Sequence, residues 1–383
     1  MKANACTKAI SPFKIKTIGN CIRVHSDGLN VHFTAVVNQH AVVVTTVSRL
    51  TNNEFDRWVR YGDFLKALRA FKTADISFRE TRDGCLIIAS EYATLELPPV
   101  PQPHCLTYGP RVTAGVPESE TNRGGVAFDG AWFKPLLQTH LVYAGTDYVR
   151  SNIYGINFHS NGDQLVVVST NGHCLIRQEF AATSEQDFTV LPEYGARHSL
   201  ILPTDVAELA VRFTDTKIST PVLLTFQDGI GVRLEQEGVF SINADFYSTQ
   251  FPEYAPVLPN TEPYSKGVYD ITSLATSLTM AKPHTNKHRR ISMRFNGKLE
   301  IKAGDSFLTE FVPTVMPEVG KIDTLYFNVD YLLNALKTYG KDGEISHHFD
   351  HDNGRTSPTV FRSDDRVNKA DDTLVVVMPM NAG

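Results

Sequence analysis

The sequence predicts an α+β protein made of three similar domains in tandem. Two observations carry this prediction. Six Asx-Gly dipeptides lie between alternating apolar runs, and such dipeptides favour the tight turn of a β-hairpin. They form three pairs whose first members, at positions 27, 161 and 296, recur at intervals of about 135 residues, a period that fits whole domains rather than solenoid repeats. The dipeptides are Asp27-Gly28, Asp83-Gly84, Asn161-Gly162, Asp228-Gly229, Asn296-Gly297 and Asn353-Gly354.

Each third of the chain repeats one order of elements: a hairpin, a short helix, then a second hairpin. The predicted domains are therefore 1–117, 118–250 and 251–383. Three other Asx-Gly pairs fall outside this hairpin pattern. They are Asp129-Gly130, Asn171-Gly172 and Asp342-Gly343.

In the first third, residues 21–25 and 29–33 alternate between apolar and polar side chains, as half-buried strands do. Apolar residues at 64, 65, 68 and 71 then recur at helical spacing behind Asp63. Residues 76–78 and 85–89 form the second hairpin. Two helices are expected in each domain, but so few residues precede the first strand that the N-terminal helix must be short or missing.

The second third follows a stretch rich in Pro and Gly, 99–125, which has the composition of an interdomain linker. Its first helix, within 131–144, must begin near Pro135 or kink there, because proline cannot donate a backbone N–H. The apolar residues of 206–213 mark its second helix. In the last third, the same spacing predicts helices over 271–278 and 327–336.

Composition is that of an ordinary water-soluble protein. The 383 residues are 42% hydrophobic and 21% charged, with a formal net charge of −5. No apolar run approaches the length of a membrane span and no signal sequence follows Met1, so a cytoplasmic location is expected. The five cysteines form no CxxC motif, which argues against a zinc knuckle or a disulfide framework. No cofactor is expected.

Four stretches, in this order along the chain, resemble one known family, the bacterial DNA polymerase III beta subunit or sliding clamp. The family's architecture is three α+β domains per subunit, with two subunits closed head-to-tail so that helices line a ring and antiparallel sheets lie outside. The resemblance covers nearly the whole chain from about residue 12. The stretches are Ser169 to Leu175, Phe251-Pro252-Glu253-Tyr254 with Val257-Leu258-Pro259, Phe327 to Leu336, and Val375 to Met380.

The resemblance implies a non-enzymatic processivity factor that encircles double-stranded DNA. Its implied partners are the replicative polymerase, the clamp loader, other clamp-binding proteins and a second copy of the chain. A hydrophobic pocket that receives a short peptide is implied by matching motifs, with Cys174 standing where the family usually has Arg. The pocket residues are Ile153, Thr170, Gly172, His173, Cys174, Leu175, Pro252, Val257, Val376, Val377, Met378, Pro379 and Met380.

A ring that holds DNA topologically needs a mildly cationic hole but no base readout. An acidic outer surface is compatible with this, because it discourages DNA from binding outside the hole. The candidates for DNA contact are Lys66, Arg69, Lys72, Tyr148, Arg150, Lys282, Lys287, Arg289 and Arg290.

Two alternatives to the sliding clamp stay open. The first is a binding and assembly protein that keeps the clamp fold without a DNA function. A metal-dependent hydrolase is the third hypothesis, since the strand before Asn353-Gly354 would place His348, Asp350 and Asp352 on one face. A solvated hairpin explains these residues more simply, and no metal site is predicted. No P-loop, GxGxxG or HExxH motif occurs.

Overall fold

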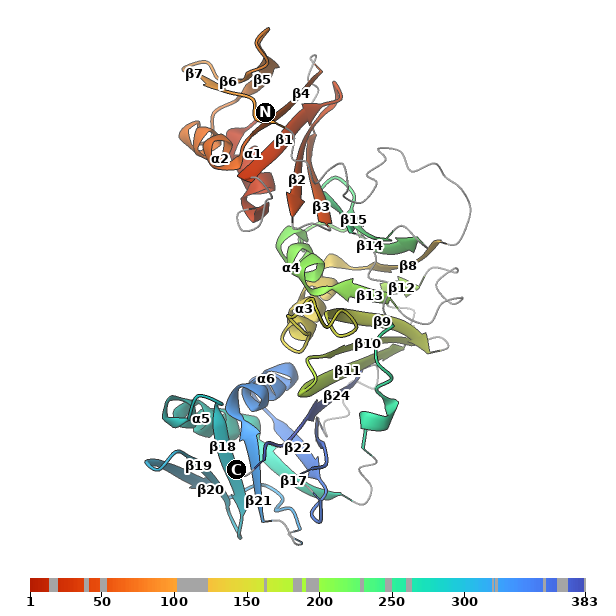
Figure 1. Ribbon diagram of the computed structural model, residues 1–383, viewed down its shortest axis with the longest axis vertical. Coiled ribbons are helices and arrows are strands. Elements are labelled where there is room, and N and C mark those ends of the chain that lie inside the picture. Colours follow the sequence, from red (N-terminus) through yellow and green to blue (C-terminus); the bar gives the residue numbers. More distant parts are fainter. Residues whose placement is uncertain are drawn as a thin grey trace. The chain divides into compact units, whose positions relative to one another are not determined.

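The computed structural model describes most of the chain (Figure 1). Its backbone contacts divide the chain into two compact units. Unit 1 comprises Met1–Gln138 and Thr183–Ser248, and unit 2 comprises Thr139–Ala182 and Thr249–Gly383. The domain boundaries expected from the sequence repeat stay a prediction. The residues outside the description are 14–19, 38–40, 49–53, 102–122, 162–163, 182–187, 191–199, 228–230, 245–249, 260–263, 319, 321–322, 354–355, 364–370 and 382–383.

Among the described residues, unit 1 holds three complete α-helices, α1, α2 and α4, and most of a fourth, α3. Its helices are α1 (Ala3–Ile10), α2 (Tyr61–Ala70), α3 (Gly130–Leu141, whose last turn belongs to unit 2) and α4 (Thr204–Phe213), with a 3-10 turn at Ser11–Phe13. Its strands are β1 (Cys21–Ser26), β2 (Asn30–Val37), β3 (Ala41–Ser48), β4 (Phe55–Arg60), β5 (Ser77–Glu80), β6 (Leu86–Ala89), β7 (Thr94–Leu97), β8 (Arg123–Phe128), β12 (Phe188–Val190), β13 (Leu200–Pro203), β14 (Val222–Gln227), β15 (Gly231–Gln236) and β16 (Phe240–Ala244).

In the described part of unit 2, the complete α-helices are α5 (Ile271–Ala281) and α6 (Val329–Tyr339), with 3-10 turns at Ala255–Val257 and Lys282–His284. Its strands are β9 (Gly155–Asn161), β10 (Gln164–Thr170), β11 (Cys174–Ala181), β17 (Ser265–Asp270), β18 (Arg290–Phe295), β19 (Leu299–Ala303), β20 (Phe307–Phe311), β21 (Thr324–Asn328), β22 (Glu344–Phe349), β23 (Thr359–Arg362) and β24 (Asp371–Val377).

A long antiparallel sheet in unit 1 joins strands from the first and second thirds of the chain. Its order is β12-β8-β14-β15-β16-β3-β2-β1-β4, and the junction is the pair β16–β3, in which Phe240 lies opposite Thr45. A second sheet has the order β5-β6-β7. Because the junction is a row of backbone hydrogen bonds, the two thirds share one continuous sheet in this unit.

The N-terminal helix is present and short, as the eight residues of α1 show. Its end is fixed to the rest of unit 1 by three contacts. Tyr61 donates its hydroxyl to the Ile10 carbonyl at 3.2 Å, Phe13 packs on Phe213 with ring centroids 5.0 Å apart, and Lys8 pairs with Asp215. Residues 1–13 therefore supply the first helix, although few residues precede strand β1.

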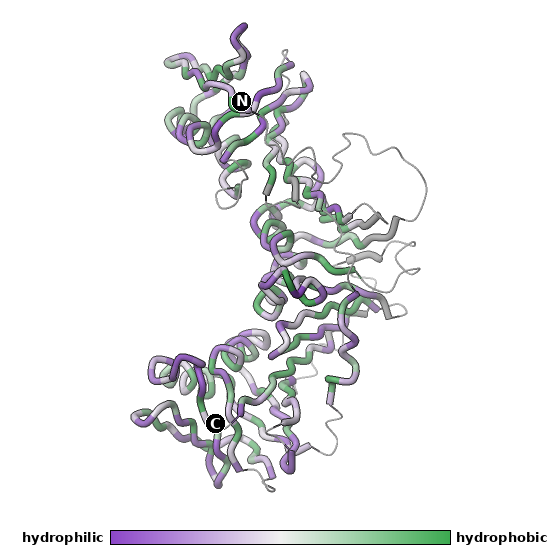
Figure 2. Tube along the Cα trace, viewed as in Figure 1, coloured by the Kyte–Doolittle hydropathy of each residue, from purple (hydrophilic) through white to green (hydrophobic). Residues whose placement is uncertain are grey.

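In unit 2, strands β9-β10-β11-β24-β23-β22-β17 form one sheet and β20-β19-β18-β21 form another. The core between α5, α6 and these sheets is apolar and includes Leu274, Leu278, Phe327, Leu332 and Val375, all buried. Figure 2 shows the same pattern along the chain, with hydrophobic residues on the strands. Of the described helices, none is long and apolar enough to cross a membrane.

The described helices lie where the sequence predicts them, with ends that differ by a few residues. Helix α6 was expected from residue 327, but β21 continues to Asn328, whose side chain caps α6 by accepting from the Asp330 N–H at 2.9 Å. Phe327 is instead a fully buried strand residue. Helix α3 begins at Gly130, five residues before Pro135.

The three hairpin turns whose Asx-Gly pairs are described, at 27–28, 83–84 and 296–297, are placed as expected, but their type differs. A type I′ turn needs φ > 0 at both central residues. Gly28, Gly84 and Gly297 have φ near +80°, yet the Asx residues before them do not have positive φ. At the first turn the Asp27 carboxylate accepts from the N–H groups of residues 29 and 30, which stabilises an Asx-turn instead. The partner glycines at 162, 229 and 354, and most of the stretch 99–125, lie outside the described residues.

Candidate functional site

Strand pairing in unit 2 brings two of the family-like stretches together. Strand β11 pairs antiparallel with β24, with Cys174 opposite Val377 and Leu175 opposite Val376. Beyond the strand, the Met378 N–H donates to the His173 carbonyl at 2.9 Å. The segment that follows β24 thus continues along the turn between β10 and β11.

That turn contains Asn171-Gly172, which was predicted to lie outside the hairpin pattern; the pairing of β10 with β11 shows that this prediction is wrong. Thr170 lies opposite Leu175 at the end of the β10–β11 ladder, and Gly172 has φ +88°. The Asn171 side-chain oxygen accepts from the N–H groups of His173 at 2.9 Å and Cys174 at 3.0 Å. These bonds stabilise the turn, in which the His173 side chain is exposed.

The thirteen expected pocket residues divide by exposure. Gly172, His173 and Val257 are exposed, whereas the remaining surface residues are half-buried. Four of the thirteen lie in the core and support the surface from below. The half-buried residues are Ile153, Thr170, Pro252, Met378, Pro379 and Met380, and the core residues are Cys174, Leu175, Val376 and Val377.

Burial determines the chemistry of Cys174. It raises the pKa of this thiol to about 12, so the thiolate is absent at neutral pH. The side chain acts as a small apolar residue.

Sequence reasoning missed one residue beside this surface, Tyr331 on α6. Its ring stacks on that of His173, with centroids 6.1 Å apart and an interplanar angle of 17°. The neighbouring backbone is also engaged, since the Met380 N–H donates to the Tyr326 carbonyl at 2.7 Å. The aromatic pair and the segment 378–380 are thus joined on one part of unit 2 by a ring contact and by two backbone hydrogen bonds.

The Phe251–Tyr254 segment is tied to the same sheet through its tyrosine. The Tyr254 hydroxyl lies 2.8 Å from Nε2 of His159 on β9 and also bonds to Arg177 on β11. Burial raises the pKa of Tyr254, so the phenol stays protonated. This anchoring holds the following turn, which carries Val257, close to strands β9 and β11.

Arg150, one of the candidates for DNA contact, lies near the turn at 171–174, and its role in DNA contact stays a prediction. Its guanidinium is 4.0 Å from the position that a Cβ on Gly172 would occupy. Ile153, in the same loop, accepts a backbone bond from Gly145 at 3.0 Å. Tyr148, in this loop as well, is exposed.

The other candidates for DNA contact differ in exposure and in the groups that they contact. Lys66, Arg69 and Lys72 lie exposed on or just after α2, and Lys287 is exposed in the loop after α5. The side chains of the remaining three interact with neighbours: Lys282 and Arg289 contact the Asp330 carboxylate at 2.7 and 3.7 Å, and Arg290 lies 5.6 Å from the ring centroid of Tyr326.

The residues of the hydrolase hypothesis serve the fold around the turn after β22. The Asp350 carboxylate accepts from the N–H groups of Asp352 and Asn353, and His348 lies 3.2 Å from the Ser346 hydroxyl. His347 is fully buried. Among the described residues, no group of three His, Cys, Asp or Glu side chains is placed to hold a metal ion.

The arrangement of helices and sheets is that of a bacterial DNA sliding clamp. Solved structures match the chain over its full length, although no family model and no curated protein matches the sequence. The DNA polymerase III subunit beta of Pseudomonas aeruginosa matches with a TM-score of 0.79 at 20% identity, covering 100% of this chain and 99% of that one. The C. crescentus beta sliding clamp matches with a TM-score of 0.78 at 18% identity, covering 100% and 98%. The α+β clamp fold predicted from the sequence is confirmed.

Proposed function

We propose that this chain is a DNA sliding clamp, a ring-shaped processivity factor that encircles duplex DNA and tethers the replicative polymerase and other proteins. It acts without catalysis, in the cytoplasm, and is placed on DNA by a clamp loader. The full-length likeness to clamp structures supports the fold. The observation that carries the function is the meeting of the 378–380 segment with the turn at 170–175.

The proposed pocket is suited to several partners. Met378 and Met380 have flexible, polarisable side chains, whereas Pro379 and the stacked pair His173–Tyr331 are rigid. Such a surface admits short, partly apolar peptides of different sequence. The backbone bonds of residues 378 and 380 fix the shape of this surface before any partner arrives.

The proposed ring consists of two copies, each with domains 1–117, 118–250 and 251–383. Two strands offer edges for such an assembly. In the part of the chain that the structure describes, β7 pairs only with β6 and β20 only with β19. The outer face of β20 exposes Leu308, and Val312 follows. Edge-to-edge pairing of β7 in one copy with β20 in another would bury these side chains and leave fewer free backbone groups.

A peptide titration tests the pocket. Fluorescence anisotropy with a clamp-binding-motif peptide should give a micromolar Kd, or about −8 kcal/mol. Met380→Ser should weaken binding at least tenfold, because it removes an apolar contact from the surface. Tyr92→Ser, which changes an exposed side chain on the β6–β7 turn of unit 1, is the matched control and should bind as the wild type does.

Primer extension on a primed circular template tests the function. With its cognate loader and polymerase, the chain should lengthen the products made in one binding event. Peptide binding without such a gain would favour the clamp-fold binding protein that has no DNA function. Retention of the gain in a His348→Ala/Asp350→Ala/Asp352→Ala variant would count against the hydrolase hypothesis.

A further inference from the structure

Strand β24 is buried on both faces, so its apolar side chains do not define its register. Leu374, Val375, Val376 and Val377 are consecutive, and none is more than 4% exposed. In a strand with one solvent-facing side, a slip of one residue is costly because it exposes the whole apolar face. In β24 the same slip would replace one buried apolar side chain by another. The register of this strand must therefore depend on polar groups near its ends.

A chain of hydrogen bonds between side chains begins at Thr373, the residue before this apolar run. Thr373 lies opposite Gln178 on β11, and its hydroxyl oxygen accepts from the Gln178 Nε2 at 2.9 Å. The Gln178 Oε1 lies 3.1 Å from Nε2 of His140, and Nδ1 of His140 lies 2.9 Å from the Ser169 hydroxyl. His140 and Ser169 are fully buried. The chain thus joins β24, β11 and β10 to the last turn of α3.

The polarity of this chain is fixed at its buried end. An amide oxygen can only accept, so the His140 ring donates from Nε2 and accepts from the Ser169 hydroxyl at Nδ1. Burial keeps the ring neutral by lowering the pKa of His140 to about 3. The Gln178 amide is therefore held with its N–H donors toward β24. A residue opposite Gln178 must accept a hydrogen bond, or a half-buried donor loses its partner.

The neighbours of Thr373 suit this position less well. The Leu374 side chain offers no acceptor. The slip that brings it opposite Gln178 would also put Pro379 at the end of the ladder, where its missing N–H loses a backbone bond. The opposite slip would bring Asp372 to Gln178 and so move a carboxylate that is now 68% exposed toward the core. Thr373 is neutral and accepts, so it satisfies Gln178 without moving a charge.

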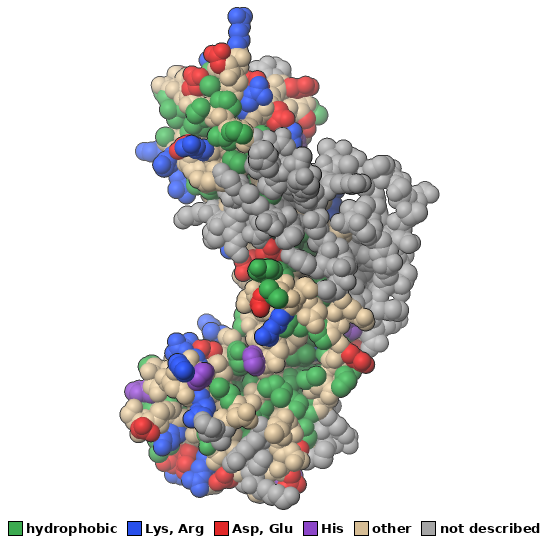
Figure 3. All heavy atoms as spheres, viewed as in Figure 1, with side chains coloured by type: hydrophobic (Ala, Val, Ile, Leu, Met, Phe, Trp, Pro, Cys, Tyr) green, Lys and Arg blue, Asp and Glu red, His purple; other side chains and the backbone are tan. Residues whose placement is uncertain are grey.

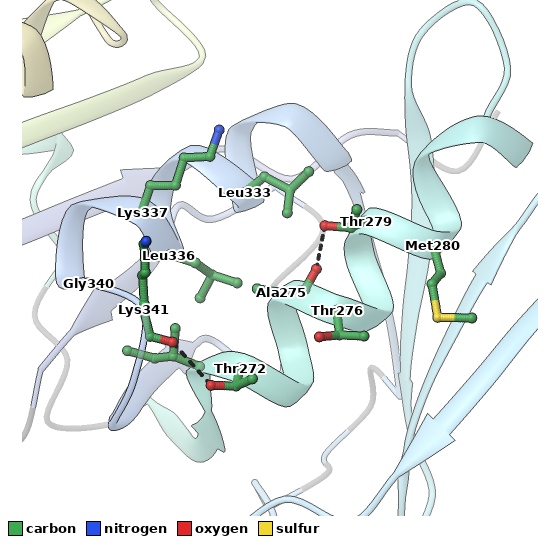
Figure 4. Close-up of a pocket in the computed structure, with 11 residues that line it drawn as sticks. Thr272, Ala275, Thr276, Thr279, Met280, Leu333, Leu336, Lys337, Gly340 and Lys341 are labelled. Carbon is green, nitrogen blue, oxygen red and sulfur yellow. Dashed lines mark hydrogen bonds between the residues drawn. The ribbon is translucent and has the colours of Figure 1, made fainter.

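Two other hydroxyls hold β24 without selecting its register. Tyr339, the last residue of α6, donates to the Thr373 carbonyl at 3.3 Å. Helix α6 is itself packed beside α5, with which it forms an open groove (Figure 4). Thr359 on β23 donates to the Val377 carbonyl at 3.1 Å. Every residue has a backbone carbonyl, so a displaced strand could accept from the same two hydroxyls. The contact between the Gln178 and Thr373 side chains therefore discriminates between registers, whereas these two contacts do not.

The register of β24 determines where the proposed peptide pocket is completed. With Cys174 opposite Val377, the segment 378–380 follows the turn at 171–174. Figure 3 shows hydrophobic side chains gathered over β11 and β24 on the face in view. A slip of one residue would move the segment by about 3.4 Å and turn each of its side chains to the other face. The segment would then no longer present the same side chains beside the turn.

We propose that Gln178 and Thr373 set the register of β24 and thereby position the segment 378–380 for peptide binding, with His140 fixing the Gln178 amide. All three are positioning residues, because none of them is among the expected pocket residues. The inference rests on the proposed pocket, and it deepens that function by assigning a role to polar side chains that the pocket motifs do not include. The register itself can be measured without any peptide.

Disulfide trapping measures the register, with Cys174 as the fixed thiol. A Val377→Cys variant places two thiols on directly opposite residues, at a distance that a disulfide spans. A Val376→Cys variant reports the slip of one residue that brings Asp372 opposite Gln178. Each variant is refolded under reducing conditions and oxidised with copper phenanthroline, and mass spectrometry of tryptic peptides gives the yield of the cross-link to Cys174. In the otherwise native chain the yield at 377 should exceed that at 376 by about tenfold or more.

Adding Thr373→Val should raise the ratio of the 376 cross-link to the 377 cross-link about fivefold, the factor that corresponds to one lost hydrogen bond. The reason is that Asp372 then becomes the nearest acceptor for Gln178. Thr373→Ser keeps the hydroxyl and should restore the native ratio. The matched control is Thr359→Val, which removes a buried hydroxyl that bonds to a carbonyl of β24 and should lower stability without changing the ratio. An unchanged ratio in Thr373→Val, or an equal rise in Thr359→Val, would overturn the proposal.

Peptide anisotropy, without the cysteine substitutions, links the register to the pocket. Because the two registers exchange only by unfolding, Thr373→Val should lower the fraction of chains that bind the clamp-binding-motif peptide and leave the Kd of the others unchanged. The loss should equal the slipped proportion that the cross-links report, a pattern that lower stability alone does not give. Binding by every Thr373→Val chain would overturn the positioning role. Failure of the wild type to bind the peptide would instead refute the proposed pocket, while the cross-link ratio still decides the register.

Discussion

Acid should destabilise unit 2 through His347, and replacing this residue should remove part of the effect. The imidazole is fully buried, and it stacks on Phe361 with ring centroids 4.5 Å apart. Neither ring nitrogen has a hydrogen-bond partner among the described residues. Burial lowers the pKa of His347 to about 3, and the nearby His348 adds to this. The folded protein therefore keeps the ring neutral.

The direction of the effect follows from the two pKa values. The unfolded chain binds a proton at its ordinary histidine pKa of about 6.5, whereas the folded chain does not. This residue's contribution to stability is complete above pH 6.5 and is lost as the pH falls toward 3. The loss is about 1.4 kcal/mol per pH unit, or about 2 kcal/mol between pH 7.5 and pH 5. His140, also buried with a pKa lowered to about 3, adds a second loss of the same sign.

Urea unfolding followed by circular dichroism, at pH 7.5, 6 and 5, measures this loss. His347→Phe keeps the aromatic stack and should lose about 2 kcal/mol less than the wild type over that range. Hydrogen exchange of peptides from β22 assigns the difference to unit 2. His288→Phe, on an exposed loop, is the control and should follow the wild type. An acid loss in His347→Phe equal to that of the wild type would refute the reasoning.

Three further substitutions test the packing and the turns. Gly267→Ala should lower the melting temperature, because the added Cβ would lie 2.2 Å from the Tyr269 hydroxyl oxygen. Such overpacking costs about 1–3 kcal/mol. A melting temperature equal to that of the wild type would contradict this clash. Asn328→Ala should cost about 1 kcal/mol in chemical unfolding, since it removes the cap of α6, and Asn328→Asp should recover most of that loss. Asn171→Ala should weaken binding of the clamp-motif peptide about fivefold, or by about 1 kcal/mol, because it removes the bonds that stabilise the turn at 171–174. Unchanged anisotropy curves would show that the turn does not shape the pocket.

The order of elements could be predicted because it depends on local patterns. Alternating runs and Asx-Gly turns are visible in a few residues, and the helical spacing of Val206, Leu209 and Phe213 is enough to predict α4. The start of α6 was missed although its signal was local. Asn328 is a strong capping residue, but the apolar spacing continues through Phe327 and hides the end of the strand.

The environment of the candidate site could not be predicted in the same way. Tyr331 meets His173 only because β24 lies beside β11 and α6 packs on the same core, contacts between residues far apart in the sequence. The ion pair of Lys282 with Asp330 likewise requires α5 and α6 to pack together. Sequence spacing predicts which cationic side chains lie on a helix. It does not predict which of these charges is neutralised by a carboxylate from a neighbouring element.

The position of β24 in its sheet has a consequence during protein synthesis. This strand lies between β11 and β23, so β11, which is made much earlier, keeps an open edge until residues 371–377 leave the ribosome. The proposed pocket, completed by residues 378–380, exists only after that step. An incomplete chain would therefore be unable to compete with finished copies for the same peptides, and its exposed strand edges would mark it for chaperones or proteases.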